Sequence, residues 1–339
     1  MKSWLWIFVG VCLLGCEQRG PQVVVYVSTD EAIASPILDA FQVQTGITVL
    51  IVGDTEARKT TGLIERIETE GGQPVGDVLW SSEGLGTARL QRQGLLAPHH
   101  SATTASWPEA WRSSDQTWFA FSPRPRVLVY DPARVNEGDL PQVWSDLADP
   151  TWRDHIVIAD PRFGTTGGHF ATMRSWMAEA SVDSWPSFLE GLQANRVRML
   201  PGGNAAVVDA IRHGDALIGA TDADDVHAAN RQGAELAMAM LPHGPQTGPM
   251  LMPNTVAILA GARHPREAAL LVDWLLSDEV ARMLAASDSR NIPLQPDVAA
   301  QFPELMVEHP LVPHLPDIER HATGVIEEVV TAIREHPET

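Results

Sequence analysis

Three aspartates close together mark the clearest place in this sequence where chemistry could occur. Asp222, Asp224 and Asp225 follow a short apolar run and are preceded by Thr221. One aspartate is enough to cap a helix and favour its dipole, but three carboxylates need solvent, a cation or hydroxyl and amine donors to compensate them. Carboxylate oxygens suit Ca²⁺, Mg²⁺ or ferric ions, although the D-x-D-x-D-G pattern of an EF-hand is missing from the sequence. We predict that Thr221, Asp222 and Asp225 contact a ligand.

Two arginines provide the opposite charge. Arg124 and Arg126 lie two residues apart in the stretch SPRPRVLVY, so in an extended chain their side chains point to the same side. Paired guanidinium groups there could bind a carboxylate, carbonate or phosphate. The alternative is that they join a crossover strand to nearby acids through salt bridges.

The other candidate residues lie where predicted strands end and helices begin. Ser, Thr, Asp and Asn are favoured as helix caps, and helix N-termini also offer free N–H groups to anions. Capping alone and capping combined with ligand contact therefore both remain open for these positions. They are Thr29 and Asp30, Thr55 and Glu56, Ser82 and Glu83, Thr165 and Thr166, and Asn204.

The start of the chain indicates export. A lysine precedes a short apolar run that ends at Leu14 and is too short for a spanning helix of ~20 residues. The following Leu-Leu-Gly-Cys resembles the lipobox of bacterial lipoproteins, in which the cysteine becomes the acylated N-terminus. We predict a lipoprotein signal peptide over residues 1–15, a linker over 16–22, and lipid on Cys16 as the membrane attachment. An ordinary signal peptide is the alternative.

Composition limits the partners of the mature chain. Removing residues 1–15 takes away one lysine from 24 basic residues and leaves 43 acidic ones, a net charge of −20. Such a surface repels nucleic acid and anionic headgroups. After cleavage Cys16 is the one remaining cysteine, so no disulfide or thiolate cluster can form within the chain. A length of 339 residues favours two lobes.

Hydrophobic patterning predicts an α/β protein. Apolar strand-like runs at residues 23–27, 47–52 and 75–80 alternate with two amphipathic helical segments, which is the βαβαβ order of a mostly parallel sheet. The first turn lacks GxGxxG, so a dinucleotide site is not supported. Further alternating segments continue to the C-terminal helices. The later strands are predicted at 126–131, 155–160, 196–200, 216–220, 236–241 and 255–259, and the later helices at 169–180, 204–214, 264–285 and 318–336.

Three patterns together resemble the extracellular solute-binding proteins of ABC importers, in the branch named for ferric iron. They are F-x-x-x-T-G-I-x-V at 41–49, G-D-V-x-W at 76–80 and H-P-x-x-A-x-x-L at 264–271. The resemblance implies a type II periplasmic-binding-protein (Venus-flytrap) fold, in which each of two lobes is a mixed, mostly parallel sheet flanked by helices. It places the first lobe at 23–124 plus 254–300, the second at 125–253, and a helical segment at 301–339.

The resemblance also implies the role. A monomeric receptor, tethered in the periplasm through Cys16, would close its lobes on a small ligand and deliver it to a permease and its ATPase. No cofactor is expected, and no enzyme: the sequence contains neither G-x-S-x-G nor H-E-x-x-H, and no cysteine nucleophile remains after processing. A secreted hydrolase is the remote alternative.

The ligand is where this chain departs from the branch. Ferric-binding relatives hold iron with adjacent tyrosines, whereas this chain has only Tyr26 and Tyr130, and TDADD stands where the pair is expected. Ferric iron or another metal, bound through Glu56 and Asp222, is the first expectation. A sugar phosphate or phosphonate held by Arg124, Arg126 and the GTTGG helix start, or a polyamine held by the acids, are the alternatives.

Overall fold

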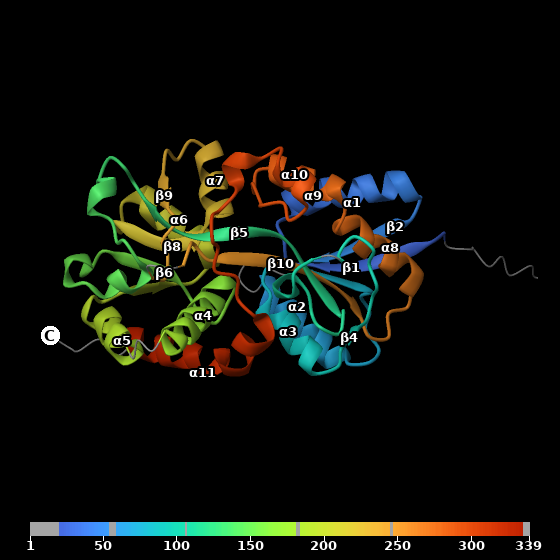
Figure 1. Cartoon of the computed structure of the whole chain (residues 1–339), viewed down its shortest axis with the longest axis horizontal. Helices are drawn as coiled ribbons and strands as arrows, with labels where there is room; N and C mark the ends of the chain where they lie inside the picture. Colours follow the sequence, from blue (N-terminus) through green and yellow to red (C-terminus); the bar gives the residue numbers. More distant parts are fainter. Residues whose placement is uncertain (1–19, 54–58, 106, 181–183, 245–246, 335–339) are drawn as a thin grey trace, which may run out of the picture.

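The computed structural model describes residues 20–53, 59–105, 107–180, 184–244 and 247–334 (Figure 1). Cys16, the predicted signal peptide, Thr55 and Glu56 lie outside the described residues. Among the described helices, none combines the length and apolar character needed to cross a membrane.

The first lobe is built on three parallel strands. β1 (Gln22–Val27) lies between β2 (Thr48–Gly53) and β3 (Val78–Ser81). The connecting helices are α1 (Glu31–Thr45) and α2 (Lys59–Glu70), and α3 (Leu85–Arg92) follows β3. This confirms the predicted βαβαβ order. Because β1 is central, all residues from Val23 to Val27 are buried in the first core.

Two long strands join the halves of the molecule. β5 (Trp118–Tyr130) and β10 (Leu251–Leu259) are antiparallel neighbours in the middle of the sheet (Figure 1). The first half of β5 pairs with β10, and the second half pairs with β8 (Ile218–Asp222) and β9 (Ala237–Ala239). The short β4 (Leu96–Ala97) also pairs with β10. One strand therefore contributes to both lobes.

The second lobe has β6 (Ile156–Ala159) between β7 (Arg198–Leu200) and β8, all parallel. Two separate clusters of apolar side chains cover it, one containing Leu128 and Ile158 and the other Val127 and Val157. Alternate residues of each strand thus face opposite layers. The helices of this lobe are α4 (Thr165–Glu179), α5 (Trp185–Ala194), α6 (Gly203–His213) and α7 (Ala223–Arg231).

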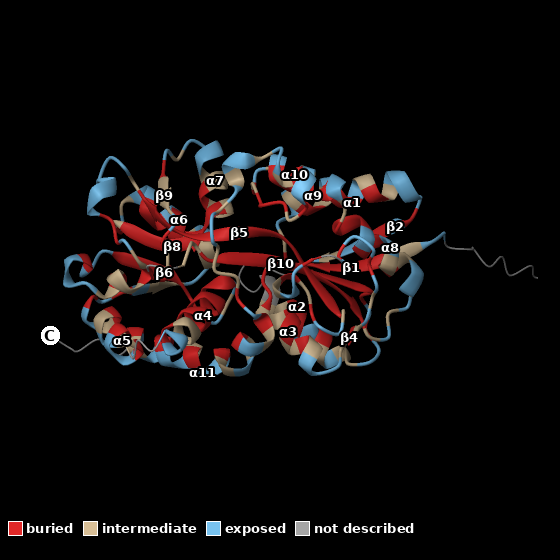
Figure 2. Ribbon diagram, in the orientation of Figure 1, coloured by how far each residue is buried: buried red, intermediate tan, exposed pale blue. Residues whose placement is uncertain are grey.

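The C-terminal helices divide between the lobes. α8 (Pro265–Leu275) and α9 (Asp278–Ala286) pack on the first core. The sequence predicts them as one helix, but Ser277 starts a second helix and its Oγ accepts the N–H of Val280 at 3.3 Å. α11 (Leu315–Arg334) adds its apolar face to the core of the second lobe, as Figures 1 and 2 show. The remaining helical turns are α10 (Pro296–Ala299) and 3₁₀ turns at Glu109–Trp111, Glu137–Asp139, Trp144–Ala148, Pro150–Trp152 and Pro303–Leu305.

Candidate ligand site between the lobes

Asp222 is the centre of the polar site. It ends β8 and occupies the N-cap position of α7, but its side chain makes no capping hydrogen bond. The carboxylate, which is fully buried, instead accepts four donors. These are Arg126 Nη1 at 2.8 Å on Oδ1, and Arg124 Nε at 3.0 Å, Thr165 Oγ1 at 2.8 Å and Asn204 Nδ2 at 3.0 Å on Oδ2. The cap alternative therefore does not describe what this side chain does.

Strand register brings the arginines to this carboxylate. β5 pairs with β8 so that Arg126 lies opposite Asp222, and Arg124 lies two residues earlier on the same side. Arg124 also donates Nη2 to the carbonyl of Ser82 at 2.8 Å, so it links Asp222 of the second lobe to the end of β3 in the first. Burial by itself would raise the pKa of Asp222, but the charges of Arg124 and Arg126 hold it below its usual value.

Three predicted polar residues complete the network around Arg126. Thr165 Oγ1 and Asn204 Oδ1 accept its Nη1 at 3.0 and 3.2 Å, and Thr166 Oγ1 lies at 3.5 Å from Nη2. Thr221 Oγ1 donates to the carbonyl of Asn204 at 3.4 Å. The structure thus brings together every candidate that the sequence predicts in the second lobe, except that Asp225 lies beside this network and not within it.

Asp224 and Asp225 have fewer side-chain partners than Asp222 among the described residues. One oxygen from each of Asp222, Asp224 and Asp225 lies within 4.8 Å of the others. Arg124 Nε is 3.2 Å from Asp224, whose side chain is 28% exposed. Burial, together with the neighbouring charges of Asp222 and Asp30, raises the pKa of Asp224 to about 6 in spite of the opposing charge of Arg124. Burial and the same acids, with Asp224, raise the pKa of Asp225 well above its usual value.

The first lobe contributes the ends of β1 and β3. Ser28 Oγ accepts the N–H of Ser82 at 2.8 Å, so the two strand ends are tied together. Asp30 is exposed at the start of α1 and acts electrostatically on Asp224 across the lobes. The Oγ1 of Thr29 is buried and has no partner among the described residues.

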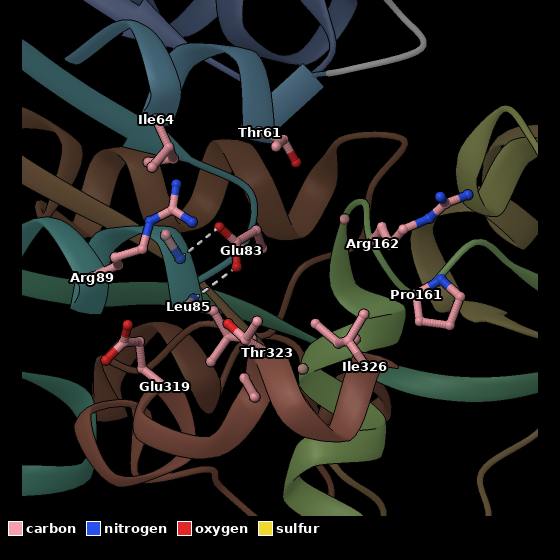
Figure 3. Close-up of a pocket in the computed structure, with 15 residues that line it drawn as sticks. Thr61, Ile64, Glu83, Leu85, Arg89, Pro161, Arg162, Glu319, Thr323 and Ile326 are labelled. Atoms are coloured by element: carbon pink, nitrogen blue, oxygen red, sulfur yellow. Dashed lines mark hydrogen bonds between the residues drawn. The ribbon is translucent and has the colours of Figure 1, made fainter. Parts of the chain in front are cut away.

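Glu83 has a structural function in this arrangement. Its carboxylate accepts the N–H groups of Leu85 at 2.7 Å and Gly86 at 2.9 Å, which caps α3 (Figure 3). Burial raises its pKa, which these two hydrogen bonds partly offset. A pocket of about 120 Å³ lies beside it, lined from both lobes and by α11. Arg89, Arg162 and Glu319 contribute charge to this pocket; no sequence motif singles them out because they come from three distant segments.

Neither tyrosine reaches the site. Tyr26 is fully buried in β1 and donates its hydroxyl to Glu70, and Tyr130 ends β5 beyond the segment that carries the arginines. His169 does not reach the site either: it is 2% exposed and projects from α4 into the aromatic core beside Trp144. The described part of the site therefore consists of carboxylates, arginines, hydroxyls and an amide.

Comparison with known proteins identifies the family of the chain. The profile of the family described as bacterial extracellular solute-binding protein matches residues 77–306. The chain belongs to this family. It is 27% identical to the major ferric iron-binding protein of Neisseria meningitidis serogroup A over 319 residues, which are 90% of this chain and 92% of that one.

Solved structures share the two-lobed fold. Iron-bound HitA from Pseudomonas aeruginosa matches with a TM-score of 0.74 at 23% identity, over 92% of this solute-binding protein and 99% of HitA. The periplasmic binding protein AfuA from Actinobacillus pleuropneumoniae, solved with fructose-6-phosphate, matches with a TM-score of 0.74 at 19% identity, over 94% and 100% of the two chains. The predicted resemblance and fold class are confirmed, and the relatives are named as binding proteins and not as enzymes.

Proposed function

We propose that this solute-binding protein is the receptor of an ABC importer and that it captures a metal cation, ferric iron first, between its lobes. The observation that carries the proposal is the convergence of carboxylates from both lobes. Asp224 and Asp225 begin α7, and Asp30 of the first lobe is close enough to act on the pKa of both. Oxygen ligands of this kind suit hard cations.

The donors around Asp222 support a division of roles among the acids. Asp222 already accepts four donors, three on Oδ2 and one on Oδ1, and both arginines are among them. We therefore assign direct coordination to Asp224, Asp225 and Asp30, and a supporting position to Asp222, which the sequence had suggested as a ligand. Glu56, outside the described residues, remains the proposed further ligand of the first lobe.

The alternatives differ in how well they suit the site. An organic amine such as a polyamine is the second candidate, because the same carboxylates would accept its N–H groups. A phosphorylated solute is supported by the AfuA structure with fructose-6-phosphate. It suits this site less well, because Arg124 and Arg126 already bind Asp222.

The cellular role follows from the family. The receptor acts in the periplasm, where residues 23–124 with 254–300 and residues 125–253 are the lobes that close on the cation. The closed monomer then docks on a permease coupled to its ATPase. We propose that Cys16 carries the lipid anchor. Replacing Cys16 by serine should move the protein from the detergent phase to the aqueous phase of a Triton X-114 extract, and unchanged partition would reject the anchor.

The test is a thermal-shift titration of the mature chain with Fe³⁺ supplied as its nitrilotriacetate chelate, beside the chelator alone, a phosphorylated sugar and a polyamine. A ligand of the folded state stabilises it by ~2.7 kcal/mol at a hundredfold excess over Kd. We expect a shift with iron that Asp224→Ala loses and Asp39→Ala keeps, since Asp39 is an exposed acid of α1 outside the site. A shift with the sugar or polyamine alone would reject the metal assignment.

A further inference from the structure

Two arginines of β5 meet a carboxylate that belongs to the chain itself. The side chains of Arg126 and Asp222 are completely buried, and that of Arg124 is 6% exposed. Paired guanidinium groups in a cleft are the usual means of holding a carboxylate or phosphate ligand. In this protein that position is already filled.

We propose that Asp222 is a built-in counter-anion: it occupies the arginine-lined anion position, so that the receptor takes its solute as a cation without a co-bound anion. This inference rests on the proposed function and deepens it, because it names the class of solute that the cleft accepts and the residue that determines it.

The hydrogen-bonding capacity of the carboxylate supports this assignment. Oδ1 and Oδ2 together accept two arginines, one threonine and one asparagine at 2.8 to 3.0 Å. Thr165 and Asn204 are turned inward onto Asp222 and Arg126, so these hydroxyl and amide donors are also committed. An incoming anion would find the groups that could recognise it already bound.

The remaining arginine donors do not provide a second anion position. Arg124 reaches Asp224 and the carbonyl of Ser82 in addition to Asp222. The Nε of Arg126 has no partner among the described residues and its Nη2 meets Thr166 Oγ1 at 3.5 Å, but the side chain is completely buried, so this edge is closed to a dissolved anion. Asp222 is also tethered at the end of β8, so its effective concentration at the arginines exceeds that of a dissolved anion.

Charge balance gives the functional consequence. Asp222 and Asp224 together offset the two arginines, so Asp225 is a further acid at the start of α7, and Asp30 of the first lobe acts on it electrostatically. A cation would relieve the repulsion among these acids, whereas a phosphorylated solute would increase it. The cleft is thus electrostatically suited to a cation alone.

Chemical rescue tests the proposal. Asp222→Ala removes the carboxylate and leaves room for a small one, so acetate at millimolar concentration should raise the Tm of this variant saturably and leave the wild type unchanged. Asp222→Asn keeps the side-chain volume and serves as the matched control that acetate should not rescue. Asp39→Ala controls for the loss of one negative charge.

Iron binding provides the readout that a purely structural ion pair would not change. Wild-type affinity for Fe³⁺ should be the same with and without added phosphate or acetate, whereas Asp222→Ala should bind Fe³⁺ measurably only when acetate is present. A wild type that needs phosphate to bind iron, or a folded Asp222→Ala that acetate does not stabilise, would overturn the proposal.

The wild-type comparison decides the question even when Asp222→Ala fails to fold. If phosphate or fructose-6-phosphate alone stabilises the wild type and Arg124→Met abolishes that effect, the anion position is open and Asp222 is not its occupant. Failure of iron to bind under any condition would instead reject the proposed function, and the acetate rescue would still report separately on Asp222.

Discussion

Arg124 illustrates why a charged side chain in this site differs from one on the surface. It is almost completely buried against Asp222, whereas Arg231 pairs with Asp288 at an exposed position. Removing one partner of a buried pair leaves an uncompensated charge and costs about 3–5 kcal/mol, while an exposed pair contributes about 0–1 kcal/mol. Arg124→Met should therefore lower the free energy of unfolding several times more than Arg231→Met in urea denaturation. Equal losses would show that the Arg124 pair is not effectively buried.

The pKa of Asp224 gives a second prediction for a single residue. Its folded-state value of about 6 exceeds the ordinary 3.8, so the folded protein holds a proton that the unfolded chain releases. This contribution to stability is present below the unfolded pKa and is lost as pH rises through about 6. A bound cation requires the deprotonated carboxylate.

The increase in Tm on adding Fe³⁺ should accordingly be larger near pH 7.5 than near pH 5, and Asp224→Asn should flatten this dependence. The comparison is made with the chelator present at each pH. A metal-induced shift that grows toward acid pH would contradict the assignment of Asp224 as a ligand.

Sequence alone identified the polar residues around Asp222 but not which of them pair. Asp222, Thr165 and Asn204 were predicted as ligand contacts, and for Arg124 and Arg126 salt bridges to nearby acids were the alternative, without a named partner. These residues hydrogen-bond to one another because of the register of β5 against β8. That register brings positions about a hundred residues apart into direct contact. No local pattern encodes that register, so the number of donors that Asp222 would meet could not be counted in advance.

At the scale of elements, the two long strands were predicted too short for an identifiable reason. Prolines at 123, 125 and 253 argue against strand interiors because proline lacks an N–H donor. The structure accommodates Pro253 at a register shift between Met252 and Asn254. The alternating βα segments were predicted correctly because their apolar runs and helical spacing are local properties.

The contact between α4 and α11 gives a prediction for an element. A Cβ on Gly167 would lie 2.3 Å from the carbonyl oxygen of Pro161 and 2.7 Å from Ile326 on α11. Such overpacking typically costs about 1–3 kcal/mol, so Gly167→Ala should destabilise the protein despite the higher helix propensity of alanine.

Gly324 is the matched control, because it lies in α11 with no atom within 4 Å of an added Cβ. Gly324→Ala should be stabilising by up to about 1 kcal/mol. Thermal melts of both variants measure the difference. If Gly167→Ala were as stable as Gly324→Ala, the close approach of α4 to the chain before it would be incorrect.

At the scale of the whole molecule, the lobes are connected both by strand pairing and buried contacts and by an exposed ion pair. β5 pairs with strands of both lobes, and α11 joins the second core while its Glu319 pairs with Arg92 of α3 in the first lobe at 2.7 Å. The Arg92 side chain is largely exposed, so this ion pair contributes little to holding α11 and α3 at a fixed distance from each other. The firmer connection is Arg124, which is buried and contacts Ser82 as well as Asp222.

Closure of the lobes is the last prediction. Asp30 of the first lobe and Asp224 and Asp225 of the second repel one another across the cleft, and a bound cation converts that repulsion into attraction to a common centre. Saturating Fe³⁺ should reduce the radius of gyration measured by small-angle X-ray scattering while the molecular mass stays that of a monomer. Fe³⁺ should bind the Asp30→Asn variant more weakly and reduce its radius of gyration less, because the first lobe then lacks its carboxylate ligand to the metal. An iron-bound protein with the radius of gyration of the free one would mean that the cation binds to the second lobe alone, and that the carboxylate of Asp30 does not take part in closure.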